Sequence, residues 1–469
     1  MKYSFPDGFR LGATGAGWQM EGEADKRPDQ KHFPHLMWEN DRDAWFEGVG
    51  PEVASDFYRR FRTDIPLFRQ AGIRQYRFNI DWSRFLDDYE AVTVNERAAR
   101  YYSDVIDCLL ENGIEPALCL EHWELPAALY EKYDGYASRR VQDLYVAYAQ
   151  EAFRRYGDRV HTWFAFNEPM VIPELCFLNG AWWPHEKNPR RAYAWIHGKV
   201  LCTARAARAC REILPDARFG AILNSPYIVP RDANNPDDAA AARIADDFFW
   251  RPFTDTAVLG RYPENFLRIL TDEGLLFDYR DEDARLIAEN TVDVLGMNYY
   301  QPMRVKAKET PWDGSRPFHP SKFYDDYDMP GKRMNPYRGW EIFPKSLYDI
   351  GMRIKTEYGN LPWIVSESGM GVQNEARFKG PDGVVQDDYR IDFIAEHLAW
   401  LSKAVAEGSN CQGYWLFASL DNCSPYNAFK NRYGLVEVDR AQNLARRLKK
   451  SAAWYRAASD ANCFEFKEI

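Results

Sequence analysis

The segment Thr-Trp-Phe-Ala-Phe-Asn-Glu-Pro at residues 162–169 is a short apolar run that ends on a glutamate, Glu168. A second segment of this kind, Trp-Ile-Val-Ser-Glu-Ser-Gly at residues 363–369, carries Glu367. Such runs predict buried strands of a parallel sheet that is covered on both faces. A carboxylate at the end of a buried strand is costly to desolvate unless it is paired or takes part in chemistry. The two glutamates therefore predict a paired-carboxylate active site on an α/β barrel.

Eight short apolar runs of this kind occur along the chain, near residues 9, 73, 116, 160, 219, 292, 362 and 413. Helical patterns alternate with them over 55–71, 96–110, 141–156, 191–213, 264–272, 343–358, 388–407 and 443–457, whereas 26–50 is typical of a loop. This alternation favours parallel pairing through right-handed crossovers. We expect one α/β domain over residues 1–469, a single (β/α)8 TIM barrel. The aperiodic stretch 300–341 follows the sixth strand and is expected to be a long βα loop over the catalytic face.

Composition and charge exclude several classes of function. The 469 residues carry a net charge of −10 without a long basic run, so extensive binding of nucleic acid is not expected. The N-terminus has no signal-peptide pattern, no long membrane-spanning apolar run occurs, and the eight cysteines lack metal-binding spacing. We therefore expect a cytoplasmic protein with reduced, buried thiols, no membrane contact, and neither metal nor cofactor. Assembly into a homo-oligomer is left open.

The residues that follow the predicted strands should face one common pocket. They include Gln19, His122, Trp123, Asn167, Glu168, Asn298, Tyr300 and Glu367. This set is polar and holds two carboxylates, but it has no metal triad, no Ser–His pair and no glycine-rich phosphate loop. The amides of Gln19 and Asn167 suit recognition of hydroxyl groups, because an amide both donates and accepts hydrogen bonds. Each residue alone has an ordinary structural interpretation, and only their shared position at strand ends favours a functional site.

Several motifs resemble those of family 1 glycoside hydrolases, in matching order from residue 5 to about residue 450. They are Phe-Pro-Asp-Gly-Phe at 5–9, Gln-Met-Glu-Gly at 19–22, His-Trp at 122–123, Phe-Asn-Glu-Pro at 166–169, Asn-Tyr-Tyr at 298–300 and Ser-Glu-Ser-Gly at 366–369. The resemblance implies a retaining β-glycosidase in which Glu168 is the general acid/base and Glu367 is the nucleophile. A retaining mechanism needs the two carboxyl groups about 5–5.5 Å apart and forms a covalent glycosyl-enzyme.

The same resemblance implies roles for other residues. Tyr300 would hydrogen-bond Glu367, and Asn167 would contact the sugar 2-hydroxyl. Further substrate contacts are expected from Gln19, His122, Trp123, Asn298, Trp340 and Trp415. Two like charges at such short range disfavour double ionisation, so we expect Glu168 to be protonated near neutral pH.

The segment after the eighth strand decides the substrate subclass. Many β-glucosidases of the family carry a glutamate there that binds the 4- and 6-hydroxyls, whereas this chain has Ser424. Ser424, Lys430 and Tyr433 resemble residues of the 6-phospho-β-glycosidases. A carboxylate would repel a 6-phosphate, whereas hydroxyls and an ammonium group bind it. We therefore expect a 6-phospho-β-glucosidase acting on phosphorylated β-glucosides.

Alternatives stay open at this point. One is a β-glucosidase or β-galactosidase for unphosphorylated sugars, with Lys430 a surface lysine and Ser424 a space filler. Cys423 and Pro425 stand where aromatic residues are common in the family, and Phe417 stands where Trp is usual, which leaves the choice between gluco and galacto sugars open. A more remote alternative is a non-catalytic sugar-binding barrel, which would normally lack one of the two glutamates.

Overall fold

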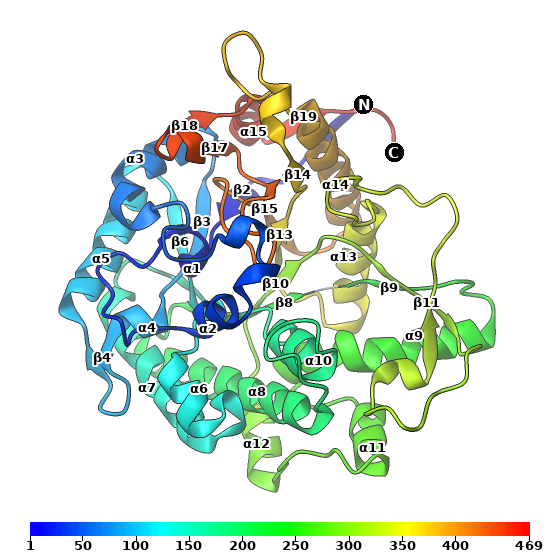
Figure 1. The fold of residues 1–469 in the computed structure, drawn as a ribbon. Coiled ribbons are helices and arrows are strands. Elements are labelled where there is room, and N and C mark those ends of the chain that lie inside the picture. Colours follow the sequence, from blue (N-terminus) through cyan, green and yellow to red (C-terminus); the bar gives the residue numbers. More distant parts are fainter. Residues whose placement is uncertain (225) are drawn as a thin grey trace.

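The computed structural model describes residues 1–224 and 226–469, and its centre is a closed barrel of eight parallel strands (Figure 1). The strands are β2 (Arg10–Thr14), β3 (Gln75–Asn79), β6 (Glu115–Glu121), β7 (Thr162–Asn167), β8 (Arg218–Asn224), β10 (Val294–Asn298), β13 (Trp363–Ser368) and β15 (Cys411–Phe417). Each pairs in parallel with its neighbours, and β15 pairs with β2 to close the ring. The eight predicted strands and the (β/α)8 barrel are confirmed.

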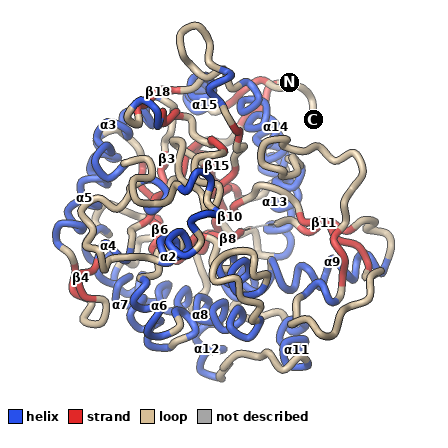
Figure 2. Tube along the Cα trace, in the orientation of Figure 1, coloured by secondary structure: helices blue, strands red, loops and turns tan. Residues whose placement is uncertain are grey.

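Helices surround the barrel, as the blue tubes of Figure 2 show. The longer ones are α3 (Phe57–Gln70), α5 (Glu96–Glu111), α7 (Arg139–Tyr156), α8 (Pro189–Ile213), α9 (Pro236–Phe249), α10 (Arg251–Val258), α11 (Glu264–Asp272), α12 (Asp281–Glu289), α13 (Lys345–Glu357), α14 (Asp388–Ala406) and α15 (Lys450–Ala461). They bury one apolar face because both faces of a parallel sheet must be covered. In α3, for example, Phe61, Ile65 and Phe68 are buried.

The remaining elements are short. The helical ones are α1 (Gly17–Met20), α2 (Phe33–Asn40), α4 (Trp82–Phe85) and α6 (Ala127–Tyr133). The strands outside the barrel include β1 (Lys2–Ser4), β4 (Leu86–Asp88), β5 (Thr93–Val94), β9 (Ile228–Pro230), β11 (Met303–Ala307), β12 (Tyr324–Asp326), β14 (Val372–Gln373), β16 (Asn431–Arg432), β17 (Val436–Asp439), β18 (Ala445–Leu448) and β19 (Cys463–Glu465). Strands β1 and β19 pair, which brings the two ends of the chain together. Over the described residues, no helix has the length and apolar character needed to cross a bilayer.

Side chains fill the interior of the barrel. Ala117, Cys119, Phe164, Ile222, Val294, Ile364 and Trp415 form one buried cluster there. The indole Nε1 of Trp415 donates to Oε1 of Gln75, at the start of β3, over 3.1 Å. This placement contradicts the predicted substrate contact of Trp415. Because side chains alternate along a strand, Trp415 lies one inward position below Phe417, and Phe417 takes the position at the rim.

Three segments differ from their prediction. The expected loop 26–50 contains α2. The expected helix 443–457 is divided, because residues 445–448 pair with β17 as strand β18 and α15 begins only at Lys450. The stretch 300–341 contains β11 and β12, which form a three-stranded sheet with β9. In the last two cases the short strands are stabilised by pairing with another strand. In each case one partner strand lies outside the segment, so the pattern of apolar residues within the segment does not predict the pairing.

Candidate active site

Two glutamates stand at the carboxyl ends of β7 and β13. Glu168 follows β7 directly and is 8% exposed, and Glu367, near the end of β13, is 3% exposed. Asn298, the last residue of β10, pairs in register with Glu367. Its Nδ2 donates to Oε1 of Glu168 over 3.0 Å. Since Asn298 is a direct neighbour of both residues, the two carboxyl groups lie at the same end of the barrel, one on each side of Asn298.

The carboxylate of Glu367 has two strong donors. The guanidinium of Arg77, from β3, forms a buried ion pair with Oε1. The hydroxyl of Tyr300 donates to Oε2 over 2.8 Å, as predicted from the resemblance. One positive charge and two hydrogen bonds therefore hold both oxygens of Glu367 in a fixed orientation.

Glu168 has a different environment. Burial raises the pKa of its carboxyl group to about 8, and the negative charge of Glu367 acts in the same direction. The hydrogen bond from Asn298 and the charge of Arg77 oppose this rise. At neutral pH most of the Glu168 side chains are therefore protonated. The site combines a proton donor with a carboxylate that is held by a cation, which is the division of labour that acid–base and nucleophilic catalysis require.

A ring of polar side chains connects these two residues with the strands opposite. Arg77 also donates to Oδ1 of Asn167 over 3.1 Å, and its guanidinium lies 3.3 Å from Nδ1 of His122. Asn298 donates to the same Asn167 oxygen, while Nδ2 of Asn167 lies 3.1 Å from Nε2 of His122. Burial, followed by the charge of Arg77, lowers the pKa of His122 well below its ordinary value. The imidazole is therefore neutral and can exchange hydrogen bonds with a sugar hydroxyl.

Arg77 is the functional residue that sequence reasoning missed. It lies inside strand β3, whereas the residues predicted to face the pocket follow the strands or lie at their ends. A signal was present, because an arginine within a short buried strand needs a counter-charge in the interior. Nothing local in the sequence indicated that Glu367, 290 positions later, supplies it.

Gln19 and Trp123 lie on adjoining segments of the same rim. The Trp18 and Trp123 rings are 6.3 Å apart, which places α1 against the segment after β6. Trp123 Nε1 donates to the backbone oxygen of Asn167 over 3.2 Å. The side chain of Gln19 is 4% exposed, and its Oε1 has no hydrogen-bond partner in the described structure. A buried amide oxygen without a partner suits a ligand hydroxyl.

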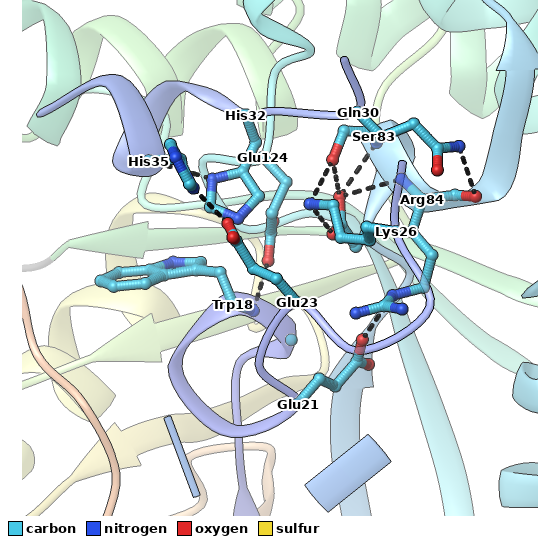
Figure 3. A network of polar contacts seen from close by, with 12 residues as sticks. Trp18, Glu21, Glu23, Lys26, Gln30, His32, His35, Ser83, Arg84 and Glu124 are labelled. Carbon is cyan, nitrogen blue, oxygen red and sulfur yellow. Dashed lines mark hydrogen bonds and ion pairs between the residues drawn. The ribbon is translucent and has the colours of Figure 1, made fainter. Parts of the chain in front are cut away.

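Glu124 connects the backbone segments of this rim, and Figure 3 shows its bond to Trp18. One of its oxygens accepts from the backbone N–H of Trp18 and from Nδ2 of Asn79, and the other accepts from the backbone N–H of His122 over 2.8 Å. Burial raises the pKa of Glu124 well above its ordinary value, which favours its neutral form. It joins the segments that carry Gln19 and His122.

An aromatic group lines the side of Glu367. The Tyr300 ring lies 5.1 Å from Trp340 and 6.1 Å from Phe417, and Phe417 lies 5.3 Å from Tyr433. Thus two of the predicted residues, Trp340 and Tyr433, are brought to the same wall as Tyr300. Phe417 belongs to this wall as well.

Ser424 and Lys430 lie in the turn that precedes Tyr433. The backbone of Ser424 pairs with that of Ala428 through two hydrogen bonds of 3.0 and 2.7 Å. The side chain of Lys430 is half-buried, with Nζ 5.8 Å from the ring centroid of Phe46. No contact joins Lys430 to Tyr433 in the described residues, so the three predicted phosphate ligands do not form one hydrogen-bonded cluster.

Carboxyl groups at the strand ends of a (β/α)8 barrel define a class, the glycoside hydrolases with paired carboxyl groups. Comparison with known proteins gives the family: the model of glycosyl hydrolase family 1 matches residues 1–464, and this chain belongs to that family. The chain is 42% identical to a 6-phospho-beta-glucosidase of Bacillus subtilis, over 99% of each chain. It is 31% identical to beta-glucosidase A of Thermotoga maritima, over 96% of each. A solved family 1 β-glucosidase from Thermotoga maritima superposes with a TM-score of 0.89 at 29% identity, covering 99% of this chain and 100% of that one.

Proposed function

We propose that this protein is a retaining β-glycosidase whose substrates are β-glucosides phosphorylated on the 6-hydroxyl. The observation that carries the reaction is the contrast between the two glutamates. Glu367 is held by Arg77 and Tyr300, while burial and the Glu367 charge keep Glu168 protonated. This contrast supports Glu367 as the nucleophile and Glu168 as the general acid.

The reaction proceeds in two steps. In the first, an oxygen of Glu367 bonds to the anomeric carbon as the bond to the leaving oxygen breaks, and Glu168 gives its proton to that oxygen. The ester has no charge, so the pKa of Glu168 falls and the group leaves this step as a carboxylate. In the second step Glu168 takes a proton from water, whose oxygen attacks the anomeric carbon and releases Glu367. Each step inverts the configuration at the anomeric carbon, so the net outcome of the two steps is retention.

The polar ring around these residues would bind the sugar. Asn167 is placed to contact the 2-hydroxyl, a contact that strengthens in the transition state. Gln19 and the neutral His122 would hold further hydroxyls, and the Trp123 and Trp340 rings would contact the sugar faces. Asn298 orients the proton donor through its bond to Glu168.

The preference for a phosphorylated sugar rests on Ser424. Because serine is neutral, the pocket beyond the sugar C6 is free of the carboxylate that would repel a phosphate, and Lys430 and Tyr433 follow on the same segment. The similarity to a protein named 6-phospho-beta-glucosidase supports the same substrate class. The eight free cysteines favour a reducing compartment, and we place this activity in the cytoplasm, in one catalytic domain over residues 1–469.

The likeness to β-glucosidases favours the alternative, hydrolysis of unphosphorylated sugars. Measuring kcat/KM for p-nitrophenyl β-glucoside and for its 6-phosphate separates the two. We expect the 6-phosphate to be preferred at least about tenfold, the effect of one charge-assisted contact. A higher kcat/KM for the unphosphorylated glucoside would establish the alternative.

A further inference from the structure

The turn 335–340, in the long loop after β10, is fixed to two other parts of the active-site rim. The Asn335 side chain donates to the backbone oxygen of Gly371, after β13, over 3.0 Å. Nδ2 of Asn431 donates to the backbone oxygen of Tyr337 over 3.2 Å. Asn431 directly follows Lys430, so this turn is joined to the segment that carries the expected phosphate ligands. A side chain that projects from the turn is therefore held in a defined position.

Arg338 projects from this turn into the aromatic wall. Its guanidinium lies over the Trp340 ring, 4.2 Å from the centroid, and it is close enough to Tyr433 to oppose the rise that burial causes in the pKa of that hydroxyl. Trp340 packs on Tyr300, whose hydroxyl donates a hydrogen bond to Glu367. Two aromatic rings therefore separate the arginine from the proposed nucleophile. It stands on the side of the pocket where Tyr433 lies.

Within residues 1–224 and 226–469, the positive charge of Arg338 has no counter-charge. Two other arginines of the same loop are paired, Arg304 with Glu341 and Arg333 with Glu396. Arg338 forms no ion pair in the described part of the chain, and its buried Nε has no hydrogen-bond partner. A half-buried cation without a partner is costly, and a ligand anion would remove that cost.

We propose that Arg338 binds the 6-phosphate of the substrate together with Tyr433 and determines the preference for phosphorylated glucosides. This inference rests on the proposed function, and it adds to Ser424, Lys430 and Tyr433 a residue from a different loop. A guanidinium can bind two phosphate oxygens at once through its fork of N–H groups, which an ammonium group cannot do. The Trp340 ring lies against one face of the guanidinium, and because the N–H groups point outward in the guanidinium plane, this stacking does not itself occupy them.

The test compares Arg338→Met and Arg338→Lys with Arg333→Met, a matched control from the same loop. For Arg338→Met we expect kcat/KM on p-nitrophenyl β-glucoside 6-phosphate to fall about 10- to 100-fold, mainly through KM, the range for loss of a charged hydrogen bond. The kcat/KM of the same variant on the unphosphorylated glucoside should fall by less than about twofold. Arg338→Lys should recover part of the loss, and Arg333→Met should behave as wild type. Inhibition by glucose 6-phosphate should weaken with Arg338→Met, whereas inhibition by glucose should not.

Three outcomes contradict the proposal in distinguishable ways. An equal loss on both substrates would show that Arg338 only supports the fold of the wall. Wild-type kcat/KM values on both substrates in Arg338→Met, with the wild type preferring the 6-phosphate, would refute the role of Arg338 and leave the proposed function intact. A wild type that prefers the unphosphorylated glucoside would refute the proposed function itself.

Discussion

Arg77 and Glu367 form an ion pair in which neither side chain is more than 5% exposed. Strand β3 supplies the cation and strand β13 the anion, and two other strands, β15 and β2, lie between them in the barrel. The pair therefore crosses the mouth of the barrel. It ties the proposed nucleophile to strands of the N-terminal part of the chain, so its contribution to stability and its contribution to catalysis are coupled.

The first prediction concerns this pair. Arg77→Met should lower the free energy of unfolding by about 3–5 kcal/mol, because it leaves Glu367 buried without a counter-charge. In Arg77→Met/Glu367→Gln the buried charge is gone, so the double variant should be more stable than Arg77→Met alone. Urea unfolding of the wild type, Arg77→Met, Glu367→Gln and the double variant measures both effects. Additive losses in the double variant would show that the two residues do not interact.

Glu367→Gly should abolish turnover, because no other carboxylate in the site is placed to attack the anomeric carbon. With sodium azide and p-nitrophenyl β-glucoside 6-phosphate, azide should take the place of the missing carboxylate, bond to the anomeric carbon as p-nitrophenolate leaves, and give an α-glycosyl azide of inverted configuration. Product configuration is read by NMR. Activity at the wild-type level in Glu367→Gly would overturn the assignment of the nucleophile.

Glu168→Ala should lower kcat/KM by about 10²–10⁴-fold for substrates whose leaving group needs a proton. For substrates with a good leaving group, such as a dinitrophenolate, the rate of the first step should fall far less, because that leaving group departs without a proton. Azide should restore turnover of these activated substrates and give a product of retained configuration, because Glu367 still forms the covalent intermediate. An equal loss for good and poor leaving groups would contradict the role of general acid.

The raised pKa of Glu168 predicts two pH effects. Activity needs the protonated form, so kcat/KM should fall as the pH rises through about 8. The folded-state pKa lies above the value of about 4.3 expected in the unfolded chain, so the folded state binds this proton more tightly. The contribution of Glu168 to stability is therefore full below about pH 4 and is lost as the pH rises toward 8. Glu168→Gln should raise Tm relative to the wild type more at pH 8 than at pH 4, and the opposite trend would contradict the assignment.

Glu174, in the short π-helix Pro173–Leu178 after β7, predicts a shift of this pH profile. Burial raises the pKa of Glu174 to about 7, and its negative charge raises the pKa of Glu168. In Glu174→Gln the alkaline limb of kcat/KM should therefore lie at lower pH than in the wild type. The control is Glu186→Gln, which removes a different carboxylate after β7, the one paired with Arg191 of α8. It should leave the alkaline limb at the wild-type pH. An unshifted limb in Glu174→Gln would show that the two carboxyl groups are electrostatically independent.

The local sequence pattern was sufficient to predict those features that depend on immediate neighbours in the chain. The eight barrel strands could be found because each is a continuous apolar run between helical segments, and Glu168 and Glu367 could be found because they interrupt such runs at their ends. The last helix was placed too early, because Ala445–Leu448 is a strand only through its pairing with β17.

The amino-acid sequence by itself determined the class of fold, the two glutamates and the neutral residue at position 424. The fold and the two glutamates follow from the order of apolar and polar residues along short segments, and the meaning of position 424 follows from the resemblance to family 1 glycoside hydrolases. Tertiary structure alone decided that Arg77 meets Glu367, that Trp415 fills the barrel instead of contacting a sugar, and that Arg338 lies beside Tyr433. The physical reason is that charge compensation, packing and the pKa of a carboxyl group depend on atoms within a few ångströms, and the barrel brings together residues that are far apart in the chain.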